Sequence, residues 1–185
     1  MSYISRLVEN YRSFVQLPWQ PSLASSQRIW FLVYHPSEER RIRTHIKDFE
    51  ASTLEAKHKW RPIDITNEPS KWLSKHEYAG EYFNHPDAIA GVEDELREHI
   101  ASTIQTVLED PSVDENTVLA VIGTGSLFGF GTVSSVVSSI ESSIRGRLLV
   151  FFPGEYDNNQ YRFMDAREGF NYMAIPITGS SRMQI

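Results

Sequence analysis

The sequence predicts one α/β domain of three layers, in which a mostly parallel sheet of about five strands lies between two layers of helices. Two continuous apolar runs, at 118–122 and 148–152, are bounded by turn residues. Such runs are typical of parallel strands, because both faces of a parallel sheet are buried. A short helical pattern lies between the two runs. Strand-helix-strand units of this length form right-handed parallel crossovers.

The first part of the chain predicts a helix, a strand and a second helix. Apolar residues recur at spacings of three and four within residues 1–20, which indicates an amphipathic N-terminal helix. Residues 28–34 are expected to form the first strand. A helix then begins near Ser37, which is a favourable N-cap residue. The exposed side of this helix carries the basic residues Arg40, Arg41, Arg43 and Lys47.

The second strand is expected at 61–66, where isoleucines alternate with polar residues. Residues 67–110 then form a helical insertion, with one helix predicted over 69–83 and another over 87–109. Insertions of this kind either determine which partner is bound or simply cover the sheet. Both interpretations stay open at this point.

The C-terminal part follows the second apolar run. A polar loop is expected at 155–165, then a short turn or helix at 165–169. A fifth strand is expected at 172–177, and residues 178–185 are expected to be a flexible tail. With 185 residues, the chain has the length of a single domain, which we expect to span residues 1–185.

Composition excludes several classes of protein. The chain has no cysteine, so disulfides, thiolate catalysis and cysteine-ligated zinc are excluded. No apolar run approaches the ~20 residues that a membrane-spanning helix needs, and the N-terminus does not resemble a signal peptide. We therefore expect a cytoplasmic protein that does not bind membranes.

Charge is distributed unevenly along the sequence. Residues 1–75 hold twelve Lys and Arg against eight Asp and Glu, a net charge of +4. Residues 76–185 hold six Arg against sixteen Asp and Glu, a net charge of −10. This difference indicates either a surface with two charged faces or chance scatter over solvated positions.

The glycine-rich loop at 123–131 invites comparison with phosphate-binding loops. The P-loop requires a lysine after its last glycine, but no lysine follows Lys75 in this chain. The dinucleotide motif requires a third glycine where Phe128 stands. The fold is therefore expected to be P-loop-like or Rossmann-like without a P-loop lysine. The glycines serve either nucleotide binding or a sharp structural or interface turn, and the second interpretation is favoured.

Polar residues are expected at the carboxyl ends of the strands, where open α/β sheets bind ligands. His35, Asp64, Thr124 and Glu155 follow four successive strands and could converge there. Carboxylates and a histidine could hold a divalent metal ion or act as acid and base. However, their spacing matches no metal-binding motif, and loops rich in Asp and Asn often bind their own backbone.

Several segments together carry a resemblance to a known family. They are YRSFVQLPW (11–19), QRIWFLVY (27–34), ERR (39–41), DENTV (114–118), SLFGF (126–130) and RGRLLVFFPGEY (145–156), followed by NNQYRFMDAR. The chain resembles the BrxB family of BREX (bacteriophage exclusion) defence systems. The resemblance covers nearly the whole chain in order. It is most specific at 145–156 and weakest at 67–110 and after Ile177.

The resemblance implies a cellular role and no chemistry. Proteins like this are encoded beside a large ATPase, a DNA methyltransferase and a PglZ-type phosphatase-like protein. Because no catalytic residues carry over, we expect a non-catalytic adaptor without a cofactor. Its expected partner is the PglZ-type protein first and the large ATPase second. Direct contact with nucleic acid is not expected.

Two other functions remain as alternatives. One is a metal- or nucleotide-dependent ligand-binding protein or enzyme that uses the carboxyl edge of the sheet. The other is a weak nucleic-acid-binding module that uses the basic helix at 40–47. For the adaptor, we expect an interface formed by Trp72, Leu127, Phe128, Phe130, Glu155, Tyr156, Asp157, Asn158, Tyr161 and Arg162.

Overall fold

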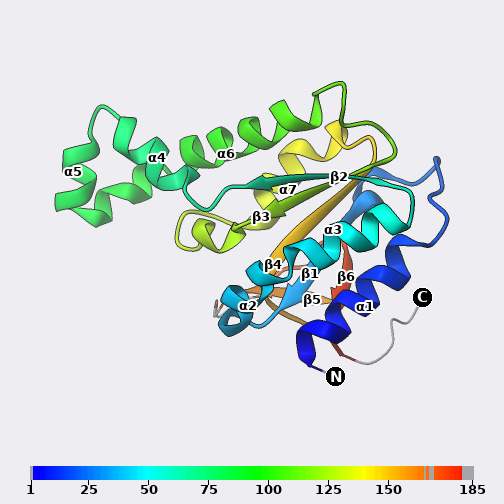
Figure 1. Cartoon of the computed structure of the whole chain (residues 1–185). Coiled ribbons are helices and arrows are strands. Elements are labelled where there is room, and N and C mark those ends of the chain that lie inside the picture. The colour runs from blue at the N-terminus through cyan, green and yellow to red at the C-terminus, as the bar shows by residue number, and fades with distance from the viewer. Residues whose placement is uncertain (1, 165, 167–168, 181–185) are drawn as a thin grey trace.

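A mainly parallel sheet forms the centre of the molecule, with helices on both of its faces (Figure 1). The coordinates are a computed structural model, which describes residues 2–164, 166 and 169–180. In this part of the chain the sheet has six strands, where the sequence predicted about five. The strands are β1 (Ile29–Tyr34), β2 (Lys59–Asp64), β3 (Thr117–Ile122), β4 (Arg147–Asp157), β5 (Gln160–Phe163) and β6 (Ile175–Thr178).

The strand order is β2-β3-β4-β1-β6, and neighbouring strands in this order are parallel. β1 therefore lies between β4 and β6, far from β2 in the sheet although it precedes β2 in the chain. The exception is β5, which pairs antiparallel with the end of β4. The predicted α/β class with a mostly parallel sheet is confirmed.

The helices form the two outer layers of the predicted three-layer arrangement (Figure 1). Helices α1, α2 and α3 pack on one face, and α6 and α7 pack on the other. Their bounds are α1 (Tyr3–Val15), α2 (Glu39–Thr44), α3 (Ile46–Glu55), α4 (Glu68–Lys75), α5 (Ala79–Asn84), α6 (Glu93–Leu108) and α7 (Val133–Ile140). Short 3₁₀ turns lie at Ser25–Arg28, Pro36–Glu38, Pro86–Gly91, Thr124–Leu127 and Glu141–Ser143.

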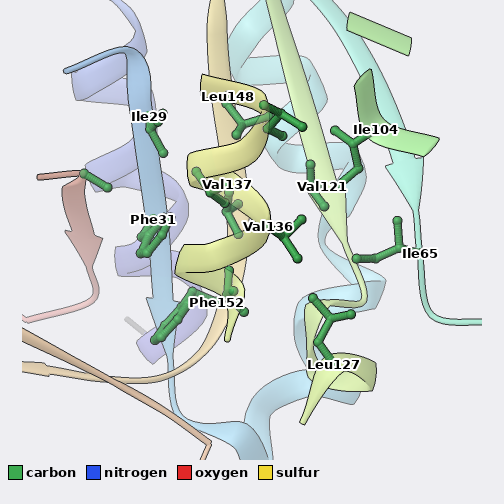
Figure 2. Close-up of a cluster of buried hydrophobic side chains, with 14 of the residues drawn as sticks. Ile29, Phe31, Ile65, Ile104, Val121, Leu127, Val136, Val137, Leu148 and Phe152 are labelled. Carbon is green, nitrogen blue, oxygen red and sulfur yellow. The ribbon is translucent and has the colours of Figure 1, made fainter. Parts of the chain in front are cut away.

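Alternate residues of each central strand belong to two separate cores. Under α6 and α7, side chains of three strands pack together with the helices, and Figure 2 shows Val136 and Val137 of α7 over them. Every residue of β1 and β3 is buried. Burial on both faces is the reason that these strands are continuous apolar runs, as predicted.

The second core lies under α1 and α3. Helix α1 begins at an N-cap, where the hydroxyl of Ser2 accepts from the backbone N–H of Ser5 at 3.1 Å. Its apolar face buries residues at the predicted spacing, so the expected N-terminal helix is present. Tyr11 and Phe49 of α3 pack edge to face, with ring centroids 5.5 Å apart.

The helical insertion is divided differently from the prediction. In place of one helix over 69–83, α4 ends at Lys75 and α5 begins at Ala79. The predicted helix at 87–109 is a 3₁₀ turn followed by α6. Helix α6 covers the sheet, whereas residues 68–91 extend beyond it as a projection that we call the arm (Figure 1).

The C-terminal part differs most from the prediction. The expected polar loop at 155–165 is largely a hairpin, because β4 continues to Asp157 and β5 follows. The expected strand at 172–177 is β6, shifted to Ile175–Thr178. The predicted turn at 165–169 and tail at 178–185 fall partly outside the described residues.

Candidate interaction surface

The turn after β3 depends on glycine for a packing reason. Gly123 has a φ of +84°, in the region that favours glycine. A Cβ atom at this position would lie 2.1 Å from Oγ1 of Thr66 and 2.8 Å from Oδ1 of Asp64. The connection after β2 therefore packs directly against the turn. This close approach explains the glycine without a bound anion.

The hydroxyl groups of the same loop bind backbone oxygens. Thr124 is buried, and its Oγ1 donates to the carbonyl of Phe151 at 2.5 Å. Ser126 donates to the carbonyl of Gly123 at 2.8 Å. These side chains hold the loop to β4 and to its own turn.

Arg43 is the centre of a polar network at the carboxyl edge of the sheet. Its guanidinium donates to Glu39 at 2.9 Å, to Asp64 at 3.0 Å and to Oγ1 of Thr66 at 2.6 Å. Burial raises the pKa of Asp64, but hydrogen bonds from Thr66 and Arg43 outweigh burial and hold that pKa below its usual value. The charge of Arg43 is thus matched by two carboxylates.

A cavity of about 350 Å³ lies beside this network, and we call it the carboxyl-edge cavity. β1 and β4 are neighbours in the sheet, but the chain leaves β1 toward the face that α1 covers and leaves β4 toward the face that α6 covers. The cavity lies at this switch point, which is where open α/β sheets bind ligands. Its lining comes from β4 and from the segments that follow β1, β2, β3 and β5, and consists of Pro36, Glu39, Arg43, Thr66, Gly123, Gly125, Ser126, Pro153 and Met164.

The four predicted edge residues do not converge as expected. Asp64 contacts the glycine turn, but Thr124 is buried beneath it. His35 bonds Ser37 at 2.7 Å, and Glu155 pairs with Arg162 on the hairpin at 3.1 Å. Among the described residues, no three histidine, aspartate or glutamate side chains form a group that could hold a metal ion.

The hairpin at 154–163 turns on two asparagines with positive φ. Asn158 has a φ of +50° and Asn159 a φ of +60°, a conformation that asparagine tolerates well. Opposite each other on the two strands, Glu155 and Arg162 form an exposed ion pair. Tyr156 donates to Oδ1 of Asn159 at 3.1 Å. Asp157 is exposed at the end of β4.

Two residues predicted for the interface lie in the core instead. Tyr161 is 0% exposed, and its hydroxyl donates to the carbonyl of Ala174 at 2.6 Å. Leu127 is 4% exposed and packs under α7 (Figure 2). The predicted interface was therefore wrong to include Tyr161 and Leu127, because both are buried and stabilise the fold.

The other three predicted apolar residues lie on the arm and on the glycine loop. Phe130 and Trp72 are half-buried and pack on the same small cluster of arm residues. Phe128 is 44% exposed, and its ring centroid lies 6.0 Å from that of Phe163 on the hairpin. We call Trp72, Phe128 and Phe130 the aromatic edge.

The sequence interpretation missed one exposed aromatic residue near this surface. Tyr78 is 57% exposed, in the break between α4 and α5. It was overlooked because a single helix was expected there. The backbone N–H of Tyr78 donates to Nδ1 of His76 at 3.3 Å, a local bond that accompanies the break.

Three of the four basic residues predicted for an exposed helix face, which lie on α2 and at the start of α3, pair with neighbouring carboxylates. Arg41 pairs with Glu38 at 2.8 Å, and Lys47 pairs with Glu50 at 2.8 Å. Together with the pairing of Arg43, these contacts leave little excess positive charge for phosphate groups.

The described residues contain no candidate membrane span, and the chain has no significant match among the known proteins compared with it. Within the described ranges, none of the helices has the length and apolarity that crossing a bilayer demands. The chain matches no protein-family model, and neither the curated proteins nor the solved structures include a significant match to it.

Proposed function

We propose that this protein is a non-catalytic adaptor in a defence complex of the BREX type, and that it binds another component through the aromatic edge. The family resemblance supplies the cellular role. The observation that supports the mode of action is the exposed Phe128, whose ring lies beside Phe163 of the β4–β5 hairpin, while Phe130 of the same loop packs against the arm. Aromatic residues are enriched among the few positions that carry most of the energy of an interface.

The surroundings of the aromatic edge suit an interface of ordinary size. A stable protein complex buries ~1,600 Å² in total, with an apolar centre and a polar rim. Here the arm and the hairpin flank the aromatic centre, and Glu155, Asp157 and Arg162 supply exposed charges. The PglZ-type protein is our first choice of partner, and the large ATPase is the second.

Co-purification of the tagged chain with each component tests the proposal. Phe128→Asp places a charge at the centre of the surface, so we expect binding to weaken at least tenfold with little effect on folding. Leu54→Asp is the matched control, because Leu54 is at least as exposed as Phe128 but lies on α3, on the other side of the sheet. If no component binds at micromolar concentration, the adaptor proposal is wrong. If Phe128→Asp and Leu54→Asp bind the partner equally well, the interface does not include the aromatic edge.

Small-ligand binding at the carboxyl edge is the second candidate function. The position of the carboxyl-edge cavity at the switch point of the sheet favours it. A thermal-shift screen with nucleotides and divalent metal ions tests it, since a ligand at 100 times its Kd stabilises a protein by ~2.7 kcal/mol. A clear shift with ATP and magnesium that Gly125→Leu removes would favour this function over the adaptor.

A further inference from the structure

A larger cavity lies at the opposite edge of the sheet, where the strands begin. Its volume is about 630 Å³, within the range of small-molecule sites. We call it the amino-edge cavity. Its lining comes from the loop after α1 and from the segments that precede or begin the strands, and consists of Trp19, Gln20, Pro21, Arg28, His58, Glu115, Asn116, Arg145 and Arg147.

Arg147 is the most unusual residue of this lining. It begins β4 on the same face as Leu149 and Phe151, where the strand otherwise places apolar side chains. It is only 5% exposed. Its guanidinium lies 4.5 Å from the ring centroid of Trp19 and 5.9 Å from that of Trp30. These cation–π contacts hold the charge but do not neutralise it.

No carboxylate of the described residues pairs with Arg147. Its hydrogen bond within the described residues is to the carbonyl of Gly146, at 3.0 Å. Burial, and next the nearby charge of Arg28, lower the pKa of Arg147 to about 10. A buried charge is normally paired, because its desolvation is costly. The structure of the protein alone gives no such partner to this one.

Two further arginines line the cavity, and both bind carbonyl oxygens only. Arg28 donates to Ile144 at 3.1 Å and to Pro21 at 3.0 Å. Arg145 donates to the carbonyls of Leu108 at 2.9 Å and of Asp110 at 2.8 Å.

These carbonyl contacts orient the guanidinium groups without pairing them with a carboxylate. Hydrogen bonds from Ser112 lower the pKa of the Asp110 carboxyl, and the nearby charges of Arg61 and Arg145 lower it further. Among the ion pairs of the described residues, none includes Arg28, Arg145 or Arg147.

The aromatic wall of the cavity is a stacked pair of rings. Trp19 stacks on His58, with ring centroids 3.6 Å apart and planes 8° apart. His58 in turn bonds Oδ1 of Asn116 at 2.6 Å. Trp19 Nε1 and Arg28 Nε are buried donors with no hydrogen-bond partner. Among the described residues, these two donors have no partner, but both lie beneath the surface of the cavity wall and are not exposed to its interior.

We propose that the amino-edge cavity binds a small phosphate-bearing ligand, held by Arg28, Arg145 and Arg147. The charge balance favours phosphate, because three guanidinium groups face a single carboxylate, Glu115, among the lining residues. The excess of two positive charges matches a phosphate group, which carries −1.5 to −2 at pH 7. Planar guanidinium groups bind phosphate oxygens through paired hydrogen bonds. This site is independent of the aromatic edge and of the adaptor function.

Thermal unfolding of the full chain in sodium phosphate tests the site, with sodium chloride of equal ionic strength as the reference. We expect phosphate to raise the unfolding temperature in a saturable way that chloride does not reproduce. AMP is the second probe. Tighter binding of AMP than of phosphate would indicate that the ligand extends along the cavity, and equal affinity would limit recognition to the phosphate group.

Three variants distinguish the site from a general effect of anions. Arg147→Met should weaken phosphate binding at least tenfold, whereas Arg40→Met, an exposed arginine outside the cavity, should leave it unchanged. Glu115→Gln should strengthen binding severalfold, because it removes the lining carboxylate. Glu115 is exposed, so this variant stays informative even if Arg147→Met fails to fold.

The proposal has clear contrary outcomes. Equal stabilisation by chloride and phosphate would overturn it, and so would a phosphate effect that all three variants preserve. Retention of a DNA oligonucleotide at low salt, without any response to phosphate or AMP, would also overturn it in favour of nucleic-acid binding.

Discussion

The two edges of the sheet surround an arginine in opposite ways. At the carboxyl edge, Arg43 meets Glu39, Asp64 and Thr66 within 3.0 Å. At the amino edge, Arg147 is more deeply buried, yet it meets aromatic rings and one carbonyl oxygen. At the carboxyl edge, the charge of Arg43 is balanced by Glu39 and Asp64. The amino edge holds guanidinium groups that, within the described part of the chain, form no ion pair with a carboxylate.

This contrast indicates different uses for the two edges. Because the charges of the carboxyl edge compensate one another, binding there must depend mainly on exposed apolar groups, of which Phe128 is one. The amino edge offers charge and oriented donors in a cavity, which suits a small anion. A charged group that has an opposite charge beside it can stabilise the fold. A buried charge without one lowers stability until a ligand of opposite charge binds.

The largest effect is expected from breaking the close packing of the carboxyl edge. Gly123→Ala should destabilise the protein by about 3 kcal/mol or more, because the new Cβ atom meets Thr66 and Asp64. Gly129→Ala is the matched control: Gly129 has a similar φ of +88° but nothing within 4 Å of the added atom. It should cost about 1 kcal/mol. Urea unfolding measures both, and equal losses would show that backbone strain alone matters.

The sequence predicted the fold well where burial follows a simple rule. β1, β3 and the first part of β4 are buried on both faces, so their residues read as continuous apolar runs. The hairpin was missed because Asp157, Asn158 and Asn159 read as a polar loop. However, two successive asparagines, which tolerate positive φ, are also typical of the turn of a hairpin, so the sequence did contain an indication of it.

The candidate site was predicted less completely than the fold. The sequence identified the aromatic edge, but it could not show that Leu127 is buried beside the exposed Phe128. Arg147 was not singled out, because a charged residue before an apolar run looks like a solvated flank. Only the tertiary position of Trp19, from a distant loop, shows that this arginine is covered.

The next prediction compares one arginine from each edge. Arg43→Met should destabilise the protein by about 1–2 kcal/mol, because it leaves Glu39 and Asp64 without their shared donor. Arg147→Met, measured without phosphate, should stay within about 1 kcal/mol of the wild type, since relief of the buried charge offsets the lost cation–π contacts. Urea unfolding of both variants at pH 7 gives the comparison. A large loss for Arg147→Met alone would mean that its role is structural.

The smallest expected effect is the pH dependence of the free energy that Arg43 contributes to folding. The folded-state pKa of Asp64 is below its ordinary value, so the stability that this carboxylate provides is fully present above the unfolded-state pKa of about 4. It is lost as pH falls through the lower folded-state value. The gap in unfolding free energy between the wild type and Arg43→Met should therefore be constant above about pH 5 and should narrow at lower pH.

Arg41→Met provides the reference for this measurement, because Arg41 is more exposed than Arg43 (57% against 34%) and pairs with one carboxylate, Glu38, so the pair should contribute little at any pH. A gap for Arg43→Met that stays constant down to about pH 2 would show that Arg43 acts through packing and not through its carboxylate partners. In that case the electrostatic contrast between the two edges would no longer hold. The unbalanced charge of Arg147 would then have to be explained without reference to a balanced counterpart.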